Sequence, residues 1–73
     1  MSKLPEIGTY VSTKKVQGIR LYVENAFGDD PNVFFIVEVI DEASKNDFTA
    51  MGNEMDKKQW EALVEEYGLE YQR

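Results

Sequence analysis

Two stretches near the start of the chain carry the pattern of hydrophobic and polar residues that is typical of β-strands. Residues 9–15 (TYVSTKK) are rich in β-branched and aromatic side chains, which favour strands. In residues 18–27, the apolar Ile19, Leu21 and Val23 alternate with polar or amphipathic neighbours. A period of two places one face of this strand against a core and the other toward water. The sequence therefore predicts two strands joined by a tight hairpin or a bulge around Gly18.

A third stretch, residues 33–40 (VFFIVEVI), is apolar on both of its faces. One face carries Val33, Phe35, Val37 and Val39, and the other carries Phe34, Ile36, Glu38 and Ile40. A strand with two apolar faces is expected in the centre of a sheet, where both faces are covered. Residues 28–32 are expected to form the turn before it, because Pro fixes φ and Asp and Asn can bond their own backbone. After a polar loop at residues 41–47, residues 48–51 are expected to form a short fourth strand.

The last third of the chain carries the pattern of an amphipathic helix with defined ends. Asp56 is a favourable N-cap, and Gln59 three residues later completes a capping-box pattern. The apolar positions recur at helical spacing and form one stripe, which consists of Trp60, Leu63, Val64 and Tyr67. Gly68 supplies the left-handed residue that ends many helices. Residues 69–71 alternate and either add a short edge strand or dock on the domain.

This order of elements predicts an α+β fold in a single domain, residues 1–73. We expect a four-stranded antiparallel β-sheet followed by one C-terminal α-helix packed on one face. A helix of about 11 residues is about 16 Å long, so it covers one face of a small sheet. Either the sheet curls into a partial barrel over Phe34, Ile36 and Ile40, or a second copy or a partner protein covers them. The expected core consists of Ile19, Leu21, Val23, Phe35, Val37, Val39, Trp60, Leu63 and Val64.

Composition removes several kinds of chemistry, because the 73 residues include neither Cys nor His. A thiol nucleophile, a disulfide, a thiolate metal site and the commonest general base are therefore excluded. Oxygen ligands for a hard cation occur without EF-hand spacing in two clusters, Asp29, Asp30 and Asn32, and Asp41, Glu42 and Asp47. Glu38 is the one acid expected among apolar neighbours, unless it faces solvent or pairs with Arg20 or Lys14 on a neighbouring strand. We expect no enzymatic activity, no cofactor and no bound metal.

The net charge of −6 is distributed unevenly along the chain. Residues 1–28 hold four bases and two acids, whereas residues 29–73 hold four bases and twelve acids. An acidic protein is repelled by nucleic acid, so a single-stranded nucleic-acid site is confined to the N-terminal strands. There, Tyr10, Lys14, Arg20 and Tyr22 form an aromatic and basic platform if the two tyrosines share a face. This is one alternative function.

A second alternative uses the acids of the C-terminal third. Six carboxylates fall within 17 residues, namely Glu54, Asp56, Glu61, Glu65, Glu66 and Glu70. A helix that presents carboxylates can compete for a basic groove by resembling a phosphate backbone, as an acidic inhibitor protein would. The competing interpretation is an ordinary solvated helix face.

Taken together, these features favour a small interaction module without enzymatic activity. The expected contact surface is formed by Tyr22, Phe34, Ile36 and Ile40, and the expected partner is another protein or a second copy. No apolar run approaches the roughly 20 residues that span a bilayer, and residues 1–6 lack the apolar stretch of a secretory signal. We therefore expect a cytoplasmic protein that does not associate with membranes.

Overall fold

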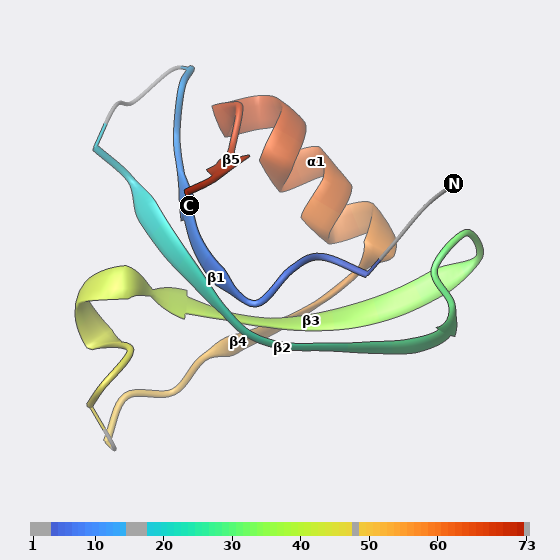
Figure 1. Ribbon diagram of the computed structural model, residues 1–73, viewed down its shortest axis with the longest axis horizontal. Helices are drawn as coiled ribbons and strands as arrows, with labels where there is room; N and C mark the ends of the chain where they lie inside the picture. The colour runs from blue at the N-terminus through green and yellow to red at the C-terminus, as the bar shows by residue number, and fades with distance from the viewer. Residues whose placement is uncertain (1–3, 15–17, 48, 73) are drawn as a thin grey trace.

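The computed structural model describes residues 4–14, 18–47 and 49–72, which form one antiparallel sheet with a single helix lying across its concave face (Figure 1). The elements in chain order are β1 (Gly8–Val11), β2 (Arg20–Asp30), β3 (Phe34–Asp41), a short 3-10 helix η1 (Glu42–Ser44), β4 (Asn53–Asp56), α1 (Lys57–Tyr67) and β5 (Glu70–Tyr71). The strands lie in the order β4-β3-β2-β1-β5, and each neighbouring pair is antiparallel. The predicted α+β class, the antiparallel sheet and the C-terminal helix are confirmed.

The number of strands and the closure of the sheet differ from the prediction of four strands in a possible partial barrel. Tyr71 of β5 pairs with Tyr10 of β1, and the Gln72 amide donates to the Thr9 carbonyl at 2.8 Å, so the sheet has five strands. β4 and β5 lie at opposite ends of the strand order, and the sheet is not closed. The sheet is strongly bent (Figure 1). β1 and the first half of β2 lie beside α1, whereas β3 passes beneath the helix. The helix therefore covers the inner, concave face alone.

An irregularity in β2 decides which of its side chains face the helix. Between Val23 and Asn25 the register with β3 shifts by one position, so that Glu24 is an extra residue in β2. One extra residue reverses the alternation of faces in the rest of a strand and increases its bend. Ala26 therefore packs against the core, whereas Phe27 faces away from the helix. The period of two in the sequence holds only as far as the bulge.

The first strand is shorter than the predicted 9–15 and ends at Val11. Its chain leaves the sheet because the amides of Thr13 and Lys14 donate to the Tyr67 carbonyl at 2.9 and 2.8 Å. These bonds satisfy an acceptor that the end of a helix leaves without a partner. Residue 15 lies outside the described residues.

The fourth strand lies at Asn53–Asp56 rather than at the predicted 48–51. Residues 49 and 50 belong to a turn instead, because the Asp47 carboxylate accepts hydrogen bonds from the Thr49 amide at 2.9 Å and from its hydroxyl at 2.7 Å. Phe48 lies outside the described residues. The predicted polar loop at 41–47 contains η1.

The core lies where β1, β2, β3 and α1 meet. Val23 and Val37 are completely enclosed. The rings of Tyr10 and Trp60 pack edge to face with centroids 5.2 Å apart, and Tyr71 packs on Tyr10 at 5.3 Å. The buried members of this cluster are Tyr10, Val23, Phe35, Val37, Val39, Trp60 and Leu69.

The predicted core is confirmed for most of its members. Val23, Phe35, Val37, Val39 and Trp60 are buried, and Leu21, Leu63 and Val64 are partly buried and pack against them. Ile19 is only half-buried and is not part of this cluster. Tyr10, Ile40 and Leu69 are buried but were not predicted as core residues. Two of these three, Tyr10 and Ile40, had been predicted as binding residues.

The ends of α1 follow the sequence prediction closely. The Asp56 carboxylate accepts a hydrogen bond from the backbone N–H of Gln59 at 2.8 Å. The backbone N–H of Asp56 in turn donates to the side-chain oxygen of Gln59 at 3.0 Å. This is the predicted capping box. At the other end, Gly68 adopts φ 61° and ψ 47°, and the Leu69 amide donates to the Val64 carbonyl at 3.0 Å. The helix is therefore held at both ends above the inner face of the sheet.

Candidate docking surface on the outer face of the sheet

The outer face of the sheet, which is turned away from α1, carries the four residues predicted to contact a partner. Tyr22 of β2 and Ile40 of β3 are paired across the two strands, and Ile36 lies further along β3 opposite Phe27. Phe34 follows at the hairpin end of β3. From Ile40 to Phe34 the strand runs about 20 Å at the usual rise per residue. The two ends of this row have different surroundings.

The end that contains Tyr22 and Ile40 is covered by the chain itself. The segment after β3 folds back over it, so that the Lys45 ammonium lies 5.2 Å from the centre of the Tyr22 ring. The Glu42 carboxylate lies 3.3 Å from the Arg20 guanidinium on the same face. Ile40 is only 7% exposed, and Tyr22 is half-buried. The prediction that Ile40 contacts a partner is therefore corrected, because η1 and the residues beside it already occupy this place.

The other end of the outer face is open and apolar. Val33 is 73% exposed, Phe34 53% and Phe27 44%, while Ile36 is half-buried beside them. These four residues are called the hairpin patch below. A shallow hollow of about 560 Å³ lies among them and is also bordered by Gly28, Asp29 and Asp30. Single exposed apolar side chains are common on protein surfaces, but a group of neighbouring large apolar side chains, as here, is unusual.

Local backbone chemistry builds the hairpin that presents the patch. β2 continues to Asp30, beyond the predicted start of the turn, and the Val33 amide closes the turn by donating to the Asp30 carbonyl at 2.9 Å. The Asp30 carboxylate also accepts from the Asn32 amide at 3.1 Å. At Gly28 a Cβ atom would lie 2.7 Å from the Phe34 carbonyl oxygen. Gly28 therefore allows the two strands to approach closely beneath the patch.

Carboxylates lie on two sides of the hairpin patch. Asp29 and Asp30 are exposed at the turn. On the outer face beyond Ile36, Glu38 of β3 is paired directly with Glu54 of β4. The patch therefore lies between two groups of acids.

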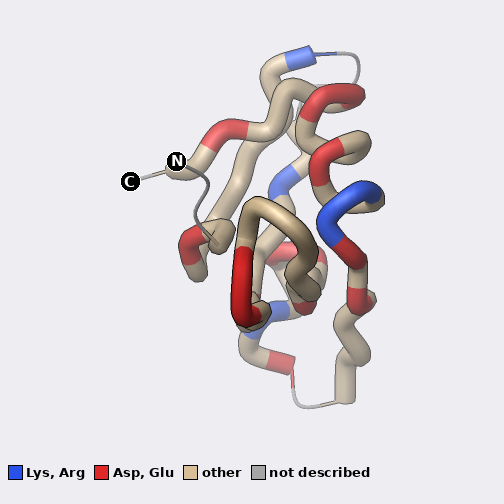
Figure 2. The backbone as a smooth tube through the Cα atoms, turned by 90° about the vertical axis from the view of Figure 1, so that its right-hand side faces the viewer, with Lys and Arg blue, Asp and Glu red and all other residues tan. Residues whose placement is uncertain are grey.

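Two lysines border the patch at the start of α1. A second hollow, next to the first, is lined by Val33, Phe34, Asp56, Lys57 and Lys58. Figure 2 views this end of the molecule and shows the acidic hairpin turn beside the basic first turn of the helix. The Lys57 ammonium lies 2.9 Å from the Glu61 carboxylate, so its charge is compensated within the helix.

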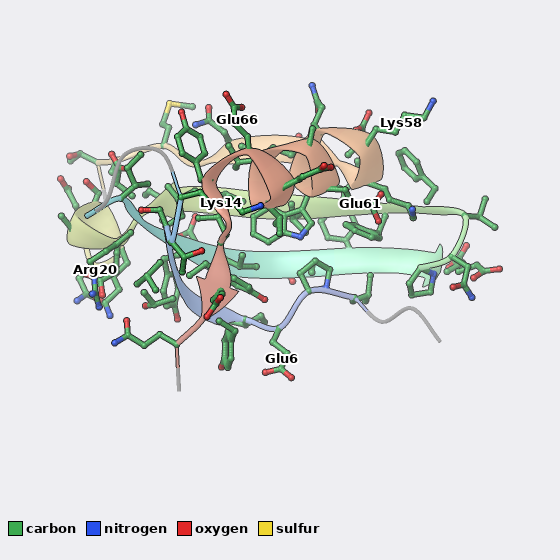
Figure 3. The ribbon with its side chains drawn as sticks, turned by 90° about the horizontal axis from the view of Figure 1, so that it is seen from above. Glu6, Lys14, Arg20, Lys58, Glu61 and Glu66 are labelled. Carbon is green, nitrogen blue, oxygen red and sulfur yellow. The ribbon has the colours of Figure 1, made fainter. Side chains whose placement is uncertain are left out.

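The structure does not bring together the residues predicted for nucleic-acid binding. Tyr10 is 8% exposed and faces α1, whereas Tyr22 lies on the outer face, because Tyr10 pairs with Leu21 in the register of β1 and β2. Lys14 lies beside the end of α1, and Arg20 lies near η1 at a different place (Figure 3). The condition on which this alternative depended, two tyrosines on one face, is not met.

The six acids of the C-terminal third do not form one surface. Asp56 is the helix cap and Glu61 is paired with Lys57. Glu54 belongs to the outer face of the sheet, and Glu70 is paired with Val11 across β5 and β1. Only part of the set, including Glu66, lies along the solvent side of the helix (Figure 3). This distribution does not resemble a regular row of phosphates.

The residues considered for catalysis and for metal binding lie apart from one another in the described part of the chain. Glu38, the one catalytic candidate, lies on the open sheet face between Asn25 and Glu54 and contacts neither Arg20 nor Lys14 among the described interactions. No three acidic residues in the described part of the chain are grouped closely enough to hold a metal ion. Across residues 4–14, 18–47 and 49–72 there is also no helix that is long and apolar enough to cross a membrane.

Among the described residues, the pKa is shifted clearly from its ordinary value at two side chains, Tyr10 and Asp47, and both lie away from the hairpin patch. Burial raises the pKa of the Tyr10 phenol, which donates to the Glu6 carbonyl at 3.0 Å. Hydrogen bonds from Thr49 lower the pKa of the exposed Asp47 carboxyl. Both shifts have structural causes, the core and a turn.

Sequence reasoning missed Phe27 and Val33 as members of the surface. Period-two alternation from Val23 assigns Phe27 to the inner face, and the bulge at Glu24 reverses that assignment. Val33 was assigned to the strand, but it lies in the turn before β3. Gly28 lies at a second register shift of β2, between Phe27 and Asp30, and a glycine within a strand pattern is an indication of such an irregularity.

Comparison with known proteins places this chain in a family. Protein ORFg in retron Ec67 from Escherichia coli is 32% identical to it over 76 aligned positions, which cover 96% of this chain and 72% of the relative. No solved structure matches the chain. The sequence profile of the domain of unknown function DUF8087 matches residues 5–69. The chain therefore belongs to the DUF8087 family.

Proposed function

We propose that this chain is a non-enzymatic protein-interaction module whose contact surface is the hairpin patch. The observation that supports the proposal is the exposure of Phe27, Val33 and Phe34 side by side on an open sheet face. Exposed apolar clusters with polar surroundings are typical of protein interfaces. The Escherichia coli relative is named only for its place in a retron, so the proposal rests on this surface.

The position of the patch within the fold also supports this proposal. α1 covers the inner face and η1 covers one end of the outer face, so the chain has no further element to lay over Phe34 among the described residues. Moving an aromatic side chain out of water is favourable, so an exposed aromatic side chain lacks the free energy that its burial would contribute. A partner seated on the patch would recover it.

Site-specific photo-cross-linking in the host cell tests the proposal. A photoreactive amino acid replaces Phe34, and in the control it replaces Ala62, which is exposed on the outer side of α1. We expect a discrete protein adduct from position 34 and none from position 62. Equal adducts at both positions, or none at either, would overturn the proposal.

The mass of the adduct also identifies the kind of partner. An increase of 8.4 kDa, the mass of this chain, identifies a second copy. Any other discrete mass identifies a different protein. This is the expected result, because two copies that each carry a net charge of −6 repel each other.

A further inference from the structure

The hairpin patch lies in line with carboxylates at both of its ends, and this arrangement indicates the chemistry of the partner. Phe34, Ile36 and Glu38 occupy alternate positions of β3 on the outer face, a span of about 13 Å. Asp30 is paired with Phe34 at one end of this row, and Glu54 is paired with Glu38 at the other. An apolar row between acids is complementary to a segment with an apolar centre and cations at both ends.

The pairing of Glu38 with Glu54 is unfavourable for the isolated chain. Like charges directly opposite each other on antiparallel strands destabilise a sheet. Two of the described bases are committed elsewhere, since Arg20 contacts Glu42 and Lys57 contacts Glu61. A cation from a partner, placed between the two carboxylates, would remove the repulsion and gain a hydrogen-bonded charge pair.

Charge argues against the other occupants of the patch. A second copy carries the same net charge of −6 and would place the acids around one patch against those around the other. The phosphates of a nucleic acid would meet the same repulsion. Lys58 borders the patch near Phe34, but the acids on the outer face and at the turn outnumber it.

Building on the proposed function, we infer that the partner presents a basic, apolar protein segment to this surface. Its aliphatic or aromatic anchor packs on Phe34 and Ile36. Its Lys or Arg side chains lie at the Glu38–Glu54 pair on one side and at the hairpin turn on the other. The apolar contact supplies most of the affinity, and the acids select a basic partner and speed its approach.

Three synthetic peptides test the inference with the intact chain labelled with 15N. The first has two lysines at each end of a Leu-Phe-Leu centre, the second has glutamates in place of the lysines, and the third has serines in place of the centre. We expect the first peptide to shift the backbone amides of residues 34–38 and to bind at least about tenfold more tightly than either of the others. Its affinity should fall as salt is added.

Either of two results with these peptides would overturn the inference. One is equal binding of the lysine and glutamate peptides, which would mean that the acids select nothing. The other is the absence of any shift on the outer face with the first peptide.

Single-charge variants separate a local effect from a change in net charge. Glu38→Gln and Glu54→Gln should each weaken binding of the first peptide about two- to fivefold and leave the midpoint of urea unfolding unchanged or raised, because a repulsion is removed. Glu65→Gln on α1 changes the net charge by the same amount and should leave binding unchanged. If Glu65→Gln weakens binding as much as Glu38→Gln, the charges act only at long range and the inference fails.

The cross-linking experiment keeps this inference distinct from the proposed function. An adduct at position 34 whose contact segment is acidic, or that is a second copy, supports an interaction module and overturns the basic partner. The absence of any specific adduct at position 34 would overturn the proposed function itself.

Discussion

The inner and outer faces of the same sheet are both rich in apolar residues, yet they are completed in different ways. On the inner face, α1 lies across the strands, and Val23, Val37 and Trp60 are enclosed by the chain alone. On the outer face, η1 covers one end, and Phe34 at the other end remains 53% exposed. A single helix of 11 residues is enough for one face only.

Because of this difference, the stability of the domain should depend on the inner face, and partner binding should depend on the outer face. Residues on the inner face are enclosed by other parts of the chain, so changing them should alter the free energy of unfolding. Val33 and Phe34 of the hairpin patch are more than half exposed, so changing them should alter binding and leave folding nearly intact. Variants of the inner face should therefore lose the most stability, and variants of the hairpin patch the least.

The largest effect is expected from Trp60→Ala, which removes the ring that joins α1 to the sheet. Trp60 is 5% exposed and packs edge to face on Tyr10. Such a truncation costs about 3–5 kcal/mol, which is comparable to the whole stability of a domain of this size, about 3–5 kcal/mol. We expect circular dichroism and urea titration to show a chain that is largely unfolded.

Two further variants keep this prediction informative. Trp60→Phe retains most of the packing and should remain folded with a reduced midpoint of unfolding. Ala62→Ser, two residues along on the exposed side of α1, should change stability by only a few tenths of a kcal/mol, about 0.5 at most. A cooperative, native-like transition for Trp60→Ala would mean that the helix does not anchor the inner face.

The inner face could be predicted from the sequence because each of its determinants is local. The capping box at Asp56 and Gln59, the stripe that includes Trp60 and the terminating Gly68 all act within α1. Period-two alternation likewise places Phe35, Val37 and Val39 on one face of β3. Short-range rules are sufficient where the chain obeys its regular period.

The outer face could be predicted only in part, because its determinants act between strands. Phe34 and Ile36 were identified, but the bulge at Glu24 brings in Phe27, and the fold-back of η1 removes Ile40. Neither a one-residue register shift nor the path of a loop is encoded in the local pattern of apolar residues. Tyr10 was misassigned for the same reason, since its face depends on pairing with Leu21.

A smaller effect on the inner face is expected at alkaline pH through Tyr10. Burial raises the pKa of its phenol above the ordinary value near 10. The folded chain therefore holds this proton more tightly than the unfolded chain does, so the contribution to stability is complete below about pH 10 and is lost as pH rises further. Urea titrations at several pH values up to 11 should show this decline.

Tyr10→Phe is the matched control for the alkaline decline. It keeps the ring against Trp60 but removes the hydrogen bond to the Glu6 carbonyl, which should cost about 1 kcal/mol at neutral pH. Above pH 10 its stability should decline less steeply than that of the parent chain. Parallel curves for the two proteins would assign the decline to other groups, such as the lysines, and would contradict a buried phenol.

The smallest effect on stability is expected from Phe34→Thr, and it is the sharpest test of the two faces. Phe34 is 53% exposed, and Thr suits a strand equally well, so the free energy of unfolding should change by no more than about 0.5 kcal/mol. The fluorescence of a dye that binds exposed apolar surface should nevertheless fall. Phe35→Thr, at the next position but 4% exposed on the inner face, should instead cost about 3–5 kcal/mol. Because both changes remove a phenylalanine from the same strand, similar losses of stability would mean that the hairpin patch belongs to the core and not to a contact surface.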